Sequence, residues 1–120
     1  MMKAAERDLI ELSDLSVESI REILDRAIFM SQQSDSIKSE GVRHVGLLFS
    51  EPSTRTVLSF RAAADRLGVD VLELQAGTSS LIKGETISDT ARTLEAMGAA
   101  AIVVRDSQEQ TARQLSRQCR

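Results

Sequence analysis

Residues 45–52, with the sequence VGLLFSEP, decide the fold of this chain. The apolar run over 45–49 is continuous, which is typical of a strand covered on both faces, as in a parallel sheet. Pro52 cannot lie inside a sheet ladder, and it disfavours helical geometry at Glu51. We therefore predict a buried strand over 45–49 that ends in a turn before the next element begins.

The segments on either side continue an alternation of helices and strands. Ser16 is a suitable N-cap for a first helix, whose apolar stripe begins at Val17. Further along, spacing and apolar runs predict helices over 53–67, 85–97 and 107–118 and strands over 69–74 and 99–104. This order predicts an α/β fold, a three-layer domain with a parallel sheet flanked by helices.

Bulk composition narrows the classes of function. The 120 residues predict one domain over 1–120, and the aromatic content of 2% predicts an aliphatic core. A net charge of −3 argues against nucleic-acid binding. One histidine and one remote cysteine, Cys119, support neither a disulfide nor a metal cluster. Without a long apolar run or a signal peptide, we expect no membrane association and a cytoplasmic setting.

The turn and helix start after the first strand carry the strongest site signal. Ligands of open α/β sheets bind beyond the carboxyl ends of the strands, and helix N-termini bind phosphate. Ser53, Thr54 and Thr56 add hydroxyl donors in one turn, and Arg55 adds a planar cation that matches phosphate oxygens. The alternative is that Ser53 is only an N-cap and Arg55 a solvated surface residue.

Two further segments come after predicted strands at the same edge of the sheet. Lys83, in the polar loop 75–84, offers a point charge for an anion, unless the loop is simply solvated. Arg105 directly succeeds the apolar run, and its alternative role is a structural salt bridge to Asp106 or Glu109. His44 precedes a strand, so we expect it at the opposite edge as a surface or packing residue.

Three ordered motifs resemble those of the aspartate and ornithine carbamoyltransferases. Residues 49–56, FSEPSTRT, with Ser59-Phe60 after them, resemble the carbamoyl-phosphate motif of that family. Residues 79–85, SSLIKGE, resemble its second motif in the aspartate-type form, and residues 91–98 with 102–105 resemble the next segment of aspartate carbamoyltransferases. The opening LSDLS at residues 12–16 is also typical, so the resemblance runs over nearly the whole chain.

The resemblance implies a set of site residues. Ser53, Thr54, Arg55 and Thr56 would hold carbamoyl phosphate, and Arg105 would help to polarise its carbonyl. Arg55, Thr56 and Arg105 would be the catalytic residues. The family assembles as trimers with active sites at subunit interfaces. Ser79 and Lys83 would therefore act in trans, as residues that a neighbouring subunit inserts into the site. No cofactor or metal is implied.

The implied reaction transfers the carbamoyl group of carbamoyl phosphate to the amine of L-aspartate, in pyrimidine biosynthesis. The chain departs from the family at Val57, where a second arginine is usual, and at Asp106, where histidine is usual. The family's His-Pro-x-Gln segment and its aspartate-binding domain have no counterpart here. We therefore expect this chain to supply the carbamoyl-phosphate half of a site and to be inactive alone.

Two alternatives stay open at this stage. The chain could be a non-catalytic module that binds carbamoyl phosphate or phosphate, or that pairs with full-length subunits. An ornithine-type carbamoyltransferase is the weaker alternative, because the SSLIKGE loop favours the aspartate type.

Overall fold

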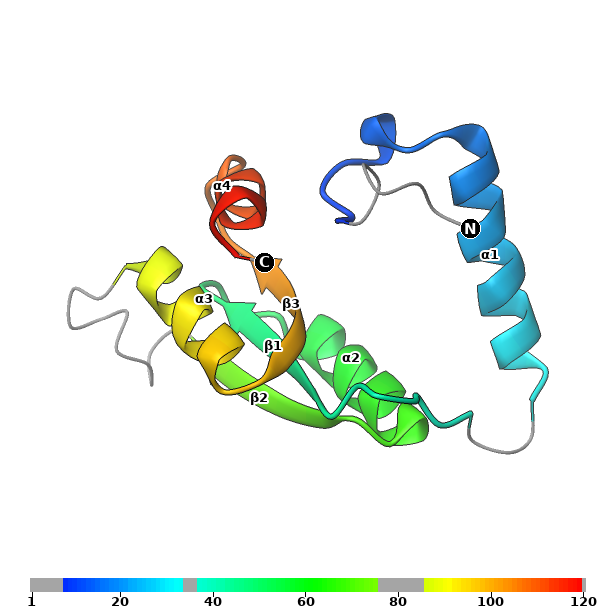
Figure 1. The fold of residues 1–120 in the computed structure, drawn as a ribbon. Helices are drawn as coiled ribbons and strands as arrows, with labels where there is room; N and C mark the ends of the chain where they lie inside the picture. Colours follow the sequence, from blue (N-terminus) through cyan, green and yellow to red (C-terminus); the bar gives the residue numbers. More distant parts are fainter. Residues whose placement is uncertain (1–7, 34–36, 76–85, 120) are drawn as a thin grey trace. The chain divides into compact units, whose positions relative to one another are not determined.

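The computed structural model describes residues 8–33, 37–75 and 86–119. Its elements, in chain order, are a 3₁₀ turn η2 (Leu12–Asp14), α1 (Val17–Ser31), β1 (His44–Phe49), α2 (Thr54–Leu67), β2 (Asp70–Gln75), α3 (Ile87–Ala96), β3 (Ala99–Arg105) and α4 (Thr111–Gln118) (Figure 1). The predicted alternation of helix and strand is therefore confirmed. The chain divides into two compact units, Met1–Ile37 and Lys38–Arg120.

The first unit is built around α1. Ser16 is its N-cap, and the Ser16 hydroxyl accepts a hydrogen bond from the amide of Ser19 at 3.1 Å, as predicted from the sequence. Glu18 lies in the first turn, where its negative charge interacts favourably with the helix dipole. The helix ends at Ser31, within the polar stretch that predicted its end.

The second unit contains the sheet. Its strand order is β2-β1-β3, and β1 pairs in parallel with both neighbours. Figure 1 shows α2 on one face of the sheet and α3 with α4 on the other. The predicted three-layer α/β domain with a parallel sheet is confirmed, with the most apolar strand at its centre.

Alternating side chains of β1 supply both halves of the core. Leu47 and Phe49 pack with Val57 of α2 on one face, and Leu48 packs on the other. The second cluster also contains Ala91, Leu94 and Leu115, from α3 and α4. A Cβ on Gly46 would lie 3.1 Å from Leu94 Cδ1, so the absence of a side chain there lets α3 approach the strand closely.

Several helix and strand boundaries in the structure differ from those predicted from the sequence. Helix α2 begins at Thr54, after Ser53, and α4 begins at Thr111 rather than 107. The continuous apolar run over 99–104 predicts a buried strand, and this was wrong: none of these residues is buried, and Ala100 and Ala101 are exposed. Their strand lies at an edge of the sheet formed by the described residues, and edge strands keep part of their surface open. None of the helices in the described ranges has the length and apolarity needed to cross a bilayer.

Candidate functional site

The carboxyl ends of β1 and β3 meet because these strands are parallel neighbours. Phe49, the last residue of β1, lies opposite Arg105, the last residue of β3. One residue beyond the strand, the Ser50 amide donates to the Arg105 carbonyl at 3.0 Å. The turn that leads into α2 therefore lies beside the Arg105 side chain, as the strand-end argument predicted.

The Arg105 guanidinium contacts this turn and the first turn of α2. Its Nε donates to Glu51 Oε1 at 2.9 Å. Its Nη1 donates to Ser53 Oγ at 2.8 Å and to Thr56 Oγ1 at 3.3 Å. Three of the predicted site residues, Ser53, Thr56 and Arg105, are thus brought together by direct contacts.

Ser53 occupies the N-cap position of α2 without capping it. Its side chain accepts no hydrogen bond from the helix backbone, whereas the N-caps of α1 and α3 both do. The hydroxyl accepts from Arg105 instead. The first-turn amides of α2 therefore have no side-chain cap from Ser53, and unpaired amides at a helix start can bind an anion.

Arg55 and Thr54 lie in the first turn of α2 and are both exposed. The Arg55 guanidinium makes no hydrogen bond or ion pair within residues 8–33, 37–75 and 86–119. The Arg55 cation and the Thr54 hydroxyl group therefore lie at the same helix start as the contacts of Arg105 with Ser53 and Thr56. Positive charge and open donors suit a small anion with several oxygens.

The expected salt-bridge partners of Arg105 were wrong. Glu51 forms that pair, rather than Asp106 or Glu109. Glu51 lies at the same edge of the sheet as Arg105 and carries the opposite charge, but it follows a different strand, so the sequence pattern did not identify it as the partner. The ion pair is half-exposed, with 47% of the Arg105 side chain and 40% of the Glu51 side chain accessible, so solvent screens it.

The Asp106 carboxylate accepts hydrogen bonds from hydroxyl and backbone amide groups rather than pairing with Arg105. It accepts hydrogen bonds from the side chains of Ser50 and Thr111. Burial alone would raise the pKa of Asp106, but these two bonds and bonds from the backbone at Ser107 and Gln108 together lower that pKa below its usual value. The sequence did not predict these two pairings, because Ser50 follows another strand, 56 residues away, and Thr111 was expected in the interior of a helix that begins at 107.

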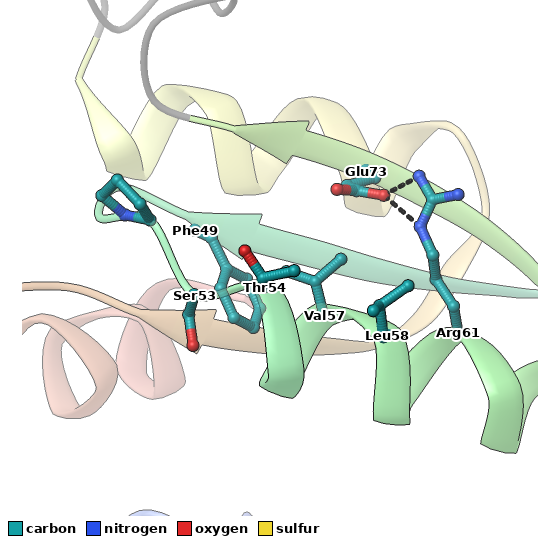
Figure 2. A pocket seen from close by; sticks show the side chains of 8 residues that line it. Phe49, Ser53, Thr54, Val57, Leu58, Arg61 and Glu73 are labelled. Carbon is teal, nitrogen blue, oxygen red and sulfur yellow. Dashed lines mark hydrogen bonds and ion pairs between the residues drawn. The ribbon is translucent and has the colours of Figure 1, made fainter.

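A cleft of about 470 Å³ opens along α2 beside this site (Figure 2). Phe49, Val57 and Leu58 supply apolar surface, and Ser53 and Thr54 lie at its end near the helix start. Further along α2, the side chains of Arg61 and Glu73 contact each other directly, and Arg61 Nε donates to Glu73 Oε2 at 2.6 Å. The complete lining is Phe49, Pro52, Ser53, Thr54, Val57, Leu58, Arg61 and Glu73.

Sequence reasoning missed the Arg61–Glu73 pair, since it joins a helix to a strand. Only 9% of the Glu73 side chain is accessible, and 55% of that of Arg61. Val57, where the resemblance implies a second arginine, is buried in the core cluster below the cleft. Its position rules out any direct contribution of this side chain to anion binding.

Some predicted site residues lie outside the described ranges. Ser79 and Lys83 are among them, as is the whole 76–85 segment. His44 is the first residue of β1, at the end of the strand opposite the site. Among the residues that the structure describes, no three His, Cys, Asp or Glu side chains are grouped so that they could hold a metal ion.

Residues 7–120 match the family model described as "Aspartate/ornithine carbamoyltransferase, carbamoyl-P binding domain". The chain belongs to this family. The match covers both the Ser53–Thr56 turn and Arg105, the residues that the structure brings together.

Relatives with established names agree with the family model. The aspartate carbamoyltransferase catalytic subunit of Desulforapulum autotrophicum is 44% identical over 108 residues, which cover 87% of this chain and 35% of that protein. The catalytic subunit of M. jannaschii aspartate transcarbamoylase superposes with a TM-score of 0.84 at 36% identity, over 95% of this chain and 38% of that one. This chain therefore spans about a third of the length of these carbamoyltransferases.

An ornithine-type member of the family has the same fold. The ornithine carbamoyltransferase of Pyrococcus furiosus superposes with a TM-score of 0.81 at 31% identity, over 99% of this chain and 39% of its own. The carbamoyl-P binding domain is thus shared by both branches.

Proposed function

We propose that this chain supplies the carbamoyl-phosphate half of an aspartate carbamoyltransferase site. The observation that carries the proposal is the Arg105 guanidinium at the end of β3, which donates to Ser53 and Thr56 at the start of α2. Arg55 adds an exposed cation in the same turn. A phosphate group placed here would meet the helix N-terminus, the hydroxyl groups and two guanidinium groups.

The roles of these groups derive from the charge that the reaction develops. The aspartate amine uses its lone pair to bond to the carbamoyl carbon, and the carbon–oxygen bond to phosphate breaks. Phosphate leaves with that electron pair and, as the most basic group formed, takes the proton that the nitrogen loses. Pre-placed donors stabilise both the carbonyl oxygen and the leaving phosphate, and Arg105 is the donor that we assign to the carbonyl.

Binding and orientation supply the rest of the rate enhancement. Holding both substrates in one site lowers the entropic barrier to their encounter. We assign the phosphate to Ser53, Thr54, Arg55 and Thr56, with Arg55, Thr56 and Arg105 acting in catalysis. The Glu51 carboxylate occupies the Arg105 Nε–H, so a bound ligand must compete with it for that donor.

Assembly and cellular setting complete the proposal. We assign Ser79 and Lys83 to the site of a neighbouring subunit, in a homotrimer, with cytoplasmic localisation and a role in pyrimidine biosynthesis. The relatives of 39–44% identity all have the name aspartate carbamoyltransferase catalytic subunit, which supports L-aspartate over ornithine as second substrate.

Calorimetric titration of the 120-residue chain with carbamoyl phosphate tests the proposal. We expect saturable binding, and we expect Arg55→Ala to weaken it by about tenfold to a hundredfold, since a hydrogen bond to a charged group contributes about 1.5–3 kcal/mol. The matched control is Arg66→Ala, which removes an exposed arginine from the last turn of the same helix. Arg66→Ala should leave the affinity unchanged.

Two outcomes would count against the proposal. If carbamoyl phosphate shows no measurable affinity for the wild-type chain, the site assignment is wrong. If Arg55→Ala and Arg66→Ala weaken binding equally, the interaction is a general charge effect rather than a site. A radiometric assay for carbamoyl-aspartate run in parallel should show little or no turnover by this chain alone.

A further inference from the structure

The carboxylate of Asp106 joins three elements at the site edge. It comes directly after the last residue of β3, it accepts from Ser50 just beyond β1, and it accepts from Thr111 at the start of α4. Backbone groups at Ser107 and Gln108 also bond to it. A carboxylate has about four lone-pair sites, so these four donors occupy them.

Ser50 connects this carboxylate to the backbone of Arg105. The Ser50 amide donates to the Arg105 carbonyl at 3.0 Å, and its hydroxyl lies 3.3 Å from the same carbonyl. The hydroxyl has one proton, and the nearer, charged Asp106 oxygen is the stronger acceptor for it. Ser50 therefore links the end of β1 to both Arg105 and Asp106.

The Arg105 side chain depends on the spacing that this link sets. Its acceptors Glu51 and Ser53 lie on the turn directly after Ser50. Arginine has a long side chain with several rotatable bonds, so its direction is set by where those acceptors lie. A change in the distance between the ends of β1 and β3 would move the acceptors relative to the guanidinium.

We propose that Asp106 is a positioning residue for Arg105. Through Ser50 its carboxylate holds the end of β1 against the end of β3, and through Thr111 it anchors that junction to α4. The guanidinium is thereby aimed at Ser53 and Thr56. The consequence for ligand binding rests on the proposed function, whereas the effect on Arg105 does not.

The first experiment needs no ligand. In the ¹⁵N-labelled chain, the Arg105 Nε–H resonance, assigned by its loss in Arg105→Lys, reports the pair with Glu51. We expect Asp106→Ala to shift or broaden this resonance and Asp106→Asn, which keeps one acceptor oxygen, to restore part of the wild-type position. Asp65→Ala, which removes an exposed carboxylate from α2, should leave the resonance unchanged.

Ser50→Ala gives an independent variant in case Asp106→Ala does not fold. It keeps the carboxylate but removes its link to β1, so it should also move the Arg105 resonance. An unchanged Arg105 Nε–H resonance in a folded Asp106→Ala or Ser50→Ala chain would overturn the proposal. A purely structural role for Asp106 would lower the unfolding free energy without moving this resonance.

The second experiment measures affinity for carbamoyl phosphate by calorimetry. We expect Asp106→Ala to weaken binding about tenfold in the wild-type background and to have no further effect in Arg105→Ala. Equal losses in both backgrounds would mean that Asp106 acts independently of Arg105, against the proposal. If the wild-type chain does not bind carbamoyl phosphate, the proposed function fails, and the resonance experiment still decides whether Asp106 positions Arg105.

Discussion

Arg105 and Asp106 are adjacent in sequence but turn to different partners. The guanidinium donates to the turn before α2 and to its first residues, and the carboxylate accepts from Ser50 and Thr111. Neighbouring residues at the end of a strand point to opposite faces of the sheet, so an ion pair between them is disfavoured. The alternation of the strand thus separates the cation from the carboxylate that comes after it.

The lowered pKa of Asp106 makes a prediction about acid stability. A carboxyl group with a lower pKa in the folded chain stabilises the fold at pH values above its unfolded pKa, about 3.9. That contribution is lost as the pH falls through the lowered folded value. We expect the free energy of unfolding of the wild-type chain, from urea titrations by circular dichroism between about pH 5 and pH 3, to fall more steeply than that of Asp106→Asn.

The effect of Asp106 is the difference in unfolding free energy between the wild-type chain and Asp106→Asn at each pH. Other carboxyl groups contribute equally to both chains, so their effect cancels in this difference. The wild-type chain should be the more stable at the upper end of this range, and the gap should narrow on acidification. If the unfolding free energies of the wild-type chain and Asp106→Asn fall in parallel with pH, the pKa of Asp106 is not lowered by folding.

Three of the described helices have a serine or threonine at the N-cap position, but the hydroxyl groups of these residues bind different partners. Ser16 and Thr86 accept hydrogen bonds from their own helices, whereas Ser53 accepts from Arg105. An N-cap bond stabilises a helix by about 1 kcal/mol. At α2 the residue type is that of a cap, and tertiary contact with β3 redirects its side chain.

This difference predicts that two matched substitutions affect different quantities, one mainly the stability of the chain and the other mainly its affinity for carbamoyl phosphate. Thr86→Ala should lower the free energy of unfolding by about 1 kcal/mol and leave the affinity for carbamoyl phosphate unchanged. Ser53→Ala should cost less stability and weaken that affinity. Urea unfolding and calorimetry measure the two quantities, and an equal loss of stability in both variants would show that Ser53 acts as an ordinary cap.

The late start of α4 has a similar cause. The polar pattern after Arg105 predicted a helix from 107, but the helix begins at Thr111. Asp106 accepts hydrogen bonds from the backbone at Ser107 and Gln108, and the chain bends at these residues before α4 begins. Aspartate side chains compete in this way with helical hydrogen bonds, which a pattern of apolar residues does not register.

For the whole molecule, the sheet has one central strand and two edges among the described residues. Strand β1 is paired on both sides, and β2 and β3 are each paired with it alone. Unpaired backbone groups on an edge strand promote association between chains. The exposed Ala100 and Ala101 offer little side-chain bulk to prevent an approach to β3.

We therefore expect the chain to associate in a concentration-dependent way, and we expect Ala100→Lys to reduce this. A charged side chain on an edge strand opposes pairing with a second strand. Sedimentation velocity over a range of concentrations measures the effect. A wild-type chain that stays monomeric, or association that is unchanged in Ala100→Lys, would contradict association through this edge.

The sequence by itself determined the alternation of elements, the buried strand over 45–49 and the strand-end residues that the structure brings together. An apolar run with a proline after it is a local signal, and parallel strands necessarily bring their carboxyl ends to one edge. Ser53, Thr56 and Arg105 could be found in this way before any contact was known.

Only the tertiary structure decided which of these groups pair with one another. Glu51 with Arg105, Asp106 with Ser50, and Arg61 with Glu73 are each joined across different elements. Such pairs depend on register and on how closely a helix packs on the sheet, and these are set by the whole core. Local periodicity contains no information about them, because it describes one element at a time.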